Sequence, residues 1–193
     1  MIKEFAAAYF ERTKDVLDSI DLDKLEQVVE LMLATVQQDK QIFVFGNGGS
    51  AAASSHFLCD INKGVSLPLD RKFRVICLND NVPILTAYAN DISYEEVFVG
   101  QLRNFLDEGD MVIGVSGSGN SPNVLKAMEY ARSKRAHTVG ITGFDGGKLA
   151  RIADVSIIAK IHDMQHTEDM QTVLTHVIMR TLCLKLHALK AAA

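Results

Sequence analysis

Residues 111–115 read Met-Val-Ile-Gly-Val, and residues 116–122 follow directly as Ser-Gly-Ser-Gly-Asn-Ser-Pro. A short apolar run that stops at small, flexible residues is typical of a buried strand ending in a loop. Ser121 is a good N-cap residue, and Pro122 suits the first position of a helix. The stretch therefore predicts a strand, a glycine-rich turn and a helix in direct succession.

The same succession of a short apolar run and a helical pattern recurs from residue 41 onward. Helical patterns at residues 50–62, 81–104, 121–134 and 147–152 separate the apolar runs, and a last, long helical pattern occupies 166–188. The other apolar runs, each rich in β-branched residues, occupy 42–45, 74–78, 138–142 and 154–158. Strands of this kind alternating with helices predict an α/β fold with three layers, in which helices cover both faces of a parallel sheet. Ligands of such sheets bind beyond the carboxyl ends of the strands, near a topological switch point.

Two helices are predicted ahead of the first strand. Residues 2–20 carry apolar side chains at helical spacing, and a capping-box pattern at Asp23 and Glu26 opens a second helix. These helices have no strand of their own to cover. They either pack against a partner subunit or fold onto their own domain, and the sequence leaves both arrangements open.

Length and composition fit one soluble domain over residues 1–193, with a helical pair at 1–40 and an α/β core at 41–188. Of the 193 residues, 48% are hydrophobic and 23% are charged, which is the usual globular mix. The formal net charge of −4 lacks the basic balance of a nucleic-acid binder, so we expect no nucleic-acid partner. No apolar run approaches the length of a membrane span, so we expect no membrane partner.

The compartment is predicted from the cysteines and the N-terminus. Cys59, Cys77 and Cys183 are odd in number and widely spaced, which favours buried free thiols in a reducing cytosol. Charged residues interrupt the apolar positions of the N-terminus, unlike a signal peptide. We therefore expect a cytoplasmic protein.

The loop at residues 116–121 has the features of an anion site. It places three serine hydroxyls and free backbone amides at the positive end of a helix, so it can bind an anion without Arg or Lys. Residues 46–50, Gly-Asn-Gly-Gly-Ser, form a similar loop after the first strand. Either loop alone is also compatible with an ordinary strand-to-helix turn, but two in one sheet favour ligand binding. The candidate binding residues are Asn47, Gly48, Ser50, Ser116, Gly117, Ser118 and Ser121.

Two polar clusters follow the second strand. Residues 79–81 read Asn-Asp-Asn at the end of that strand, and Asn90 and Asp91 come one helical stretch later. These side chains could bind sugar hydroxyls, or they could cap helices. Neither interpretation is excluded by the sequence.

Histidines and carboxylates recur at helical spacing in two segments. His56 and Asp60 are four residues apart, so they share a helix face. Glu168 and His176 are eight apart on the last helix, a little over two turns. The four could bind a divalent metal such as zinc, or supply an acid/base pair, or be hydrogen-bonded helix residues.

Together these motifs resemble the phosphoheptose isomerase family of the sugar isomerase (SIS) superfamily. The resemblance rests on residues 46–50, on His56 with an acid at 60, on Asn90 and Asp91, and on residues 116–121 and 142–147. It covers nearly the whole chain. It implies a five-stranded parallel flavodoxin-like sheet, and a homotetramer with active sites at subunit interfaces. It also implies an aldose–ketose isomerisation of sedoheptulose 7-phosphate to D-glycero-D-manno-heptose 7-phosphate, with no organic cofactor.

The resemblance also implies roles for individual residues. The serines of the 116–121 loop hold the phosphate, Asn47 and Ser50 lie nearby, and Asp60 and His176 are the acid/base residues. Family members can hold one zinc ion per site, here at His56, Asp60, Glu168 and His176, and Glu168 is also expected to contact the substrate. The chain departs from the family pattern at Asp60, where a Glu is usual, at Gly117, where a Thr is usual, and at Glu168, where a Gln is usual.

Two rival functions remain open at this point. SIS domains also serve as phosphosugar sensors or as regulatory partners of other proteins, including a replication-initiation protein. An isomerase for a different phosphosugar is the other alternative. His176 favours an enzyme, because the relative that partners a replication initiator resembles this chain in its loops but lacks that histidine.

Overall fold

The computed structural model describes residues 1–192, so Ala193, the last residue of the predicted domain, lies outside the described residues. Five parallel strands form one sheet in the order β2-β1-β3-β4-β5. The strands are β1 (Gln41–Gly46), β2 (Arg74–Cys77), β3 (Met111–Ser116), β4 (His137–Gly143) and β5 (Val155–Ala159). The prediction of a parallel α/β sheet of flavodoxin-like order is confirmed.

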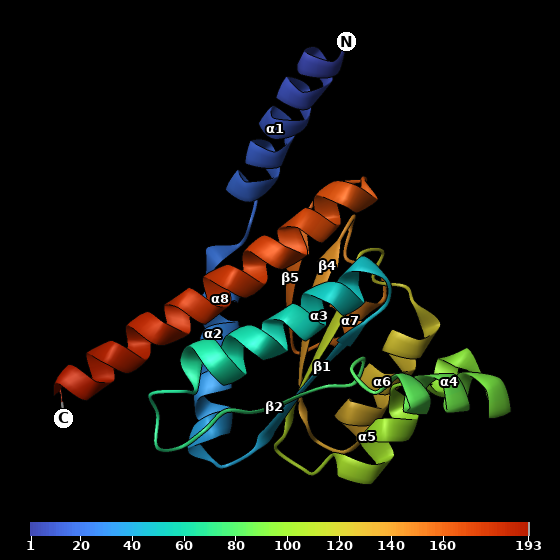
Figure 1. Cartoon of the computed structure of the whole chain (residues 1–193), viewed down its shortest axis with the longest axis vertical. Helices are drawn as coiled ribbons and strands as arrows, with labels where there is room; N and C mark the ends of the chain where they lie inside the picture. Colours follow the sequence, from blue (N-terminus) through green and yellow to red (C-terminus); the bar gives the residue numbers. More distant parts are fainter. Residues whose placement is uncertain (193) are drawn as a thin grey trace.

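Helices cover both faces of the sheet and give the three predicted layers (Figure 1). One face carries α2 (Leu22–Gln37), α3 (Gly49–Cys59), the π-helical continuation η1 (Asp60–Val65) and the long α8 (Met164–Ala192). The other face carries α5 (Val99–Phe105), α6 (Pro122–Ser133) and α7 (Leu149–Ile152), with α4 (Val82–Asp91) and the 3₁₀ turn η2 (Tyr94–Glu96) beside them.

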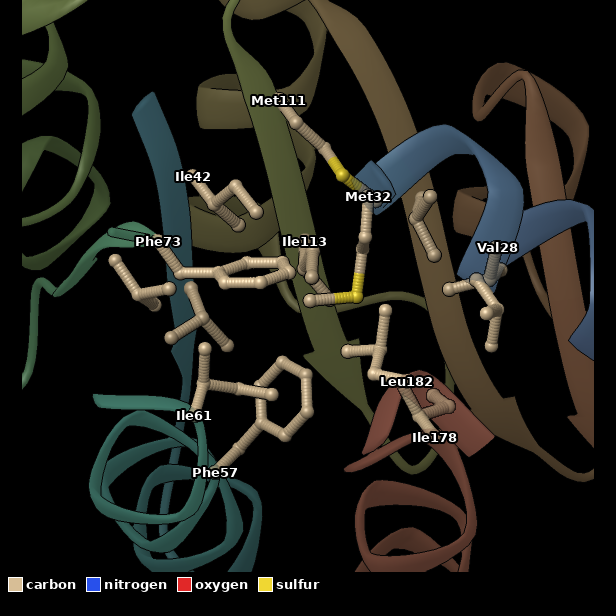
Figure 2. Close-up of a cluster of buried hydrophobic side chains, with 14 of the residues drawn as sticks. Val28, Met32, Ile42, Phe57, Ile61, Phe73, Met111, Ile113, Ile178 and Leu182 are labelled. Atoms are coloured by element: carbon tan, nitrogen blue, oxygen red, sulfur yellow. The ribbon is translucent and has the colours of Figure 1, made fainter. Parts of the chain in front are cut away.

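The alternation of side chains along the strands divides the core into two halves. Ile42 and Val44 of β1 face the cluster shown in Figure 2, where α2, η1 and α8 contribute residues such as Met32, Ile61 and Leu182. The intervening Phe43 and Phe45 point to the opposite cluster, under α5 and α6. Both faces of the strands are buried, which explains why the strands read as continuous apolar runs rather than alternating ones.

The leading helix α1 (Ile2–Asp18) extends away from the body of the molecule (Figure 1). Val16 is its single buried residue. Tyr9 fastens it to α8, because its ring stacks on the buried ring of His166 at 3.8 Å and its hydroxyl donates to Asp169 Oδ2 at 2.5 Å. This hydrogen bond, together with burial, raises the pKa of Tyr9 to about 12. The other leading helix, α2, packs on the sheet of its own chain.

Three local predictions were wrong in detail. The single helix predicted at 81–104 is α4, η2 and α5, because the chain turns at Ile92 and Ser93. The helix predicted at 50–62 continues as π-helix from Asp60. The second leading helix begins two residues earlier than the capping-box pattern suggested, since Asp21 accepts the Lys24 N–H.

The cysteines only partly match the expectation of buried thiols. All three are free, but Cys77 is buried, Cys183 is half-buried and Cys59 is exposed. Burial raises the pKa of the Cys77 thiol to about 11. Among the described residues, no helix is both long enough and apolar enough to cross a bilayer.

Candidate active site

The two glycine- and serine-rich loops meet at the switch point of the sheet. Strands β1 and β3 are neighbours, and from this pair the chain proceeds to β2 on one side and to β4 on the other. The loops that follow β1 and β3 enclose a pocket of about 240 Å³. Its lining consists of Asn47, Gly48, Ser50, Ser116, Gly117, Ser118, Ser121, Met164 and Glu168. All seven loop residues predicted to bind ligand therefore line one pocket.

The loop after β3 leaves its hydroxyls available to a ligand. Ser121 occupies the N-cap position of α6, yet its side chain makes no capping bond and lies 3.1 Å from the hydroxyl of Ser116. Gly119 has φ +64°, a left-handed conformation that glycine adopts without strain. The loop thus turns tightly and leaves the serine side chains on the pocket side.

The loop after β1 brings Glu168 into the same pocket. A Cβ added at Gly49 would overlap the Glu168 carboxyl group, so the glycine makes room for the acid at the start of α3. Next to it, Ser50 Oγ donates to Gln171 Oε1 at 2.9 Å. Among residues 1–189, whose side chains the structure describes, no hydrogen bond reaches the Glu168 carboxylate. Its negative charge therefore faces the pocket without a protein partner.

A second cluster lies further along the same pair of helices. His56 Nε2 and His176 Nε2 are 2.8 Å apart, and Asp60 Oδ2 is 3.5 Å from each. Asp60 Oδ2 is buried and has no hydrogen-bond partner. The spacing of His56 and Asp60 on one helix face was predicted, and α8 brings His176 to them.

These three residues fit a divalent cation. Their ligand atoms lie within 4.8 Å of one another. In a tetrahedral site with bonds of about 2.0–2.1 Å, ligand atoms lie about 3.3 Å apart, close to the spacings found here. An orphaned carboxylate oxygen facing two imidazole nitrogens is the donor set that zinc prefers. Glu168, the fourth predicted ligand, is not in this group.

The helices α3 and α8 run side by side in the same direction, which separates the two clusters. Gly49 lies against Glu168, Ser50 bonds Gln171, and His56 meets His176. Gly49 and His56 are seven positions apart on α3, a distance of about 10 Å along the helix. We call the line of contact between α3 and α8 the α3–α8 seam. The loop pocket is thus at one end of this seam, and the His/Asp cluster is about two turns further on.

The two polar clusters predicted after β2 lie at different places in the fold. Asn79 makes two hydrogen bonds to the backbone of Gly46, and Asn81 caps α4 by accepting the Ile84 N–H. Asn90 and Asp91 end α4, where they are exposed and bond each other at 2.8 Å. They are not part of the pocket lining within one chain.

Sequence reasoning missed three residues at the pocket. Met164 lines it, while Asn123 and Tyr94 hydrogen-bond the side chain of Asn47. Asn123 follows the recognisable Ser121–Pro122 helix start, which is the only local signal. Nothing in the sequence pairs it with a residue 76 positions away.

The comparisons with known proteins agree with this geometry. The SIS domain family matches residues 8–143. Phosphoheptose isomerase of Helicobacter pylori is 35% identical over 92% of this chain and 92% of its own length. That of Aliarcobacter butzleri is 33% identical over 94% of this chain and 95% of its own length.

A solved structure gives the same result. Phosphoheptose isomerase GmhA of Neisseria gonorrhoeae superposes with a TM-score of 0.87 at 29% identity, covering 94% of this chain and 98% of the other. The shared fold, the near-complete mutual coverage and the loop motifs all point the same way. This chain belongs to the phosphoheptose isomerase family of SIS-domain proteins.

Proposed function

We propose that this chain is an aldose–ketose isomerase that converts sedoheptulose 7-phosphate to D-glycero-D-manno-heptose 7-phosphate. The phosphate binds in the loop pocket at Ser116, Ser118 and Ser121. The carbonyl end of the sugar extends along the α3–α8 seam toward Asp60 and His176. The named relatives favour this activity over a purely regulatory phosphosugar-binding role.

The separation of the two clusters is the observation that carries this proposal. One end of the seam offers hydroxyls and amides for an anion, and the other offers a carboxylate and imidazoles for proton transfer. About 10 Å of helix lies between them. An extended sugar phosphate with its phosphate at one end and its carbonyl at the other matches that spacing.

The proton transfers follow from the positions of Asp60 and His176. Asp60 Oδ2 has no hydrogen bond, so its lone pairs are free to take a proton from the carbon beside the carbonyl. The substrate then becomes an enediol(ate). His176 Nε2 moves a proton between the two neighbouring oxygens, and the proton on Asp60 returns to the adjacent carbon. The redox change stays within the sugar, so no organic cofactor takes part.

One zinc ion per site would be held by His56, Asp60 and His176. The proton transfers above belong to the site without the ion, because Asp60 Oδ2 and His176 Nε2 would give their lone pairs to the metal. When bound, it would polarise the carbonyl and offset developing negative charge. In that arrangement His56 presents Nε2 to the site, and its role is to bind and orient.

The proposed assembly is a homotetramer with active sites at subunit interfaces. Glu168 lies about two turns from the His/Asp cluster of its own chain, so it can complete that metal site only from a neighbouring subunit. Asn90 and Asp91 are exposed at the end of α4 and would likewise reach substrate in a second copy. We place the protein in the cytoplasm, where its free thiols stay reduced.

Replacement of His176 by Ala tests the proposal. We expect turnover of sedoheptulose 7-phosphate to fall by about 10²–10⁴-fold, while binding of the sugar phosphate measured by calorimetry persists. His137→Ala removes an exposed histidine at the opposite edge of the sheet and serves as the control. Undiminished turnover in His176→Ala would refute the mechanism, and a wild-type protein inactive on this sugar both with zinc and with a chelator would refute the substrate.

A further inference from the structure

The side-chain amide of Asn47 is held from behind by two residues that do not line the pocket. Asn47 Nδ2 donates to Asn123 Oδ1 at 2.9 Å, and Asn123 Nδ2 donates back to Asn47 Oδ1 at 2.9 Å. The Tyr94 hydroxyl donates to the same Asn47 Oδ1, also at 2.9 Å. The amide of Asn47 is therefore fixed by contacts from α6 and η2.

The backbone of α6 determines which way the Asn123 amide faces. Asn123 Oδ1 accepts the Val124 N–H at 2.9 Å, and a backbone N–H can only donate. Asn123 is 2% exposed, so water does not compete for its polar atoms. Its amide nitrogen consequently faces Asn47 and can serve only as a donor.

The number of donors and acceptors around Asn47 then determines the orientation of its side-chain amide. Its Oδ1 faces two donors, the Asn123 amide and the Tyr94 hydroxyl, which use both of its lone pairs. One of its two Nδ2 hydrogens goes to Asn123. The single remaining polar hydrogen is the only group that the Asn47 side chain can offer to the pocket. A flipped Asn47 would oppose donor to donor at Asn123.

We propose that Asn123 and Tyr94 are positioning residues that keep Asn47 as a fixed hydrogen-bond donor to a phosphate oxygen of the bound sugar phosphate. This inference rests on the proposed function. A phosphate oxygen is an acceptor, so it matches the one N–H that Asn47 retains. The amide pair also ties the loop after β1 to the start of α6, and so joins the two halves of the pocket.

The orientation matters because a free Asn side chain can present either its oxygen or its nitrogen. An oxygen turned toward a phosphate would repel it. A donor held in place before the ligand arrives avoids that state and loses less conformational freedom on binding. The three residues come from sequence positions 47, 94 and 123, so this hydrogen-bonded group forms only in the folded chain.

A double-mutant cycle on the binding of inorganic phosphate tests the inference. Tyr94→Phe removes one exposed hydroxyl, and we expect phosphate to bind about 2–10-fold more weakly, the usual value of one hydrogen bond. In an Asn47→Ala background the same change should have no further effect, because Tyr94 acts through Asn47. Tyr130→Phe is the matched control, since no hydrogen bond to the Tyr130 hydroxyl is found among the described residues.

Asn123→Ala extends the cycle to the second contact. We expect weaker phosphate binding in the wild-type background and no added loss with Asn47→Ala. Asn123 is buried, so thermal unfolding must show that this variant folds. If it does not fold, Tyr94→Phe alone still decides the question, because its side chain is 59% exposed.

Steady-state kinetics separate this inference from the proposed function. Tyr94→Phe should raise KM for sedoheptulose 7-phosphate with kcat nearly unchanged, as expected for a binding contact. Equal losses with and without Asn47, or no loss at all, would overturn the positioning role. Absence of wild-type turnover would refute the substrate while the phosphate cycle still reports on Asn47. A wild-type protein that binds no phosphate would refute the inference itself.

Discussion

The buried position of Asp60 favours its proposed catalytic role and lowers the stability of the fold. Its Oδ2 is buried without a hydrogen bond, a state that costs about 1–3 kcal/mol in a folded protein. At pH 8 and in the presence of a chelator, Asp60→Asn should therefore raise the free energy of unfolding by about 1 kcal/mol. Turnover should fall by at least about 10²-fold, because the proton-accepting oxygen is lost.

Chemical denaturation and steady-state kinetics check the two halves of this prediction. Asp70→Asn, the same change at an exposed loop position, is the control and should alter neither quantity. A less stable Asp60→Asn protein would show that the carboxylate is satisfied in a way the structure does not record.

Glu168 puts a negative charge where the phosphate is proposed to bind. Its carboxylate lines the loop pocket beside Gly49, and no hydrogen-bond partner for it is found among the side chains of residues 1–189. Glu168→Gln should therefore tighten the binding of inorganic phosphate about 3–10-fold, an effect of about 1 kcal/mol. Calorimetric titration of phosphate measures it, with the exposed Glu129→Gln as the control for net charge. Unchanged or weaker binding would mean that the carboxylate turns away when phosphate enters.

At the scale of elements, the buried carboxylate of Glu96 connects η2, α5 and α6. Glu96 of η2 bonds Lys126 of α6 at 2.5 Å and Arg103 of α5 at 2.7 Å, and its side chain is 11% exposed. The Lys126 hydrogen bond, opposed by burial and reinforced by Arg103, lowers the pKa of Glu96 below its usual 4.5. A lowered pKa means that the ionised form stabilises the fold above pH 4.5, and that this stabilisation is lost as pH falls through the folded-state pKa.

Glu96→Gln should consequently destabilise the protein by about 1 kcal/mol at pH 7, since both cations are half-exposed. The difference from wild type should shrink as the pH falls from 5 to 3. Urea unfolding across this range checks the prediction. Glu95→Gln, at the exposed neighbouring position, should show no such pH dependence. A constant difference at every pH would assign the loss to packing instead of charge.

The elements themselves were largely predictable, but the pairing of α3 with α8 at the site was not. The strands were predicted well because both of their faces are buried, which leaves continuous apolar runs in the sequence. The helix predicted at 81–104 failed because α4 buries no residue, so its periodicity carried no sign of the turn at Ile92. The π-helical turn after Asp60 leaves no mark in composition either.

For the whole molecule, the loop motifs predicted the pocket, because parallel strands deliver all their carboxyl ends to one edge. The pairing of His56 with His176 depends on α3 and α8 running in the same direction, which spacing within either helix cannot reveal. Glu168 was grouped with the histidines by its spacing from His176 and by the resemblance, and the fold places it at the other end of the seam within one chain. The contacts of Asn47 with Tyr94 and Asn123 exist only in the folded chain.

The projecting helix α1 gives the last prediction, which concerns assembly. Ile2, Phe5 and Phe10 are 80%, 71% and 63% exposed on a helix that touches its own chain mainly near Tyr9 and Val16. Large apolar side chains gathered on an extended helix mark a contact surface. We expect sedimentation to give a tetramer of the 21.2-kDa chain, and the double variant Phe5→Asp, Phe10→Asp to give smaller species.

Ala8→Asp is the matched control for this experiment. It places one aspartate, against two in the double variant, on the face of α1 that already carries Glu4 and Glu11, at helical spacing from both, so it should leave the tetramer intact. If active sites form between subunits, the double variant should also lose turnover while its circular dichroism stays native. A tetramer that survives both aspartates would remove α1 from the interface, and full activity in the smaller species would place a complete active site within one chain.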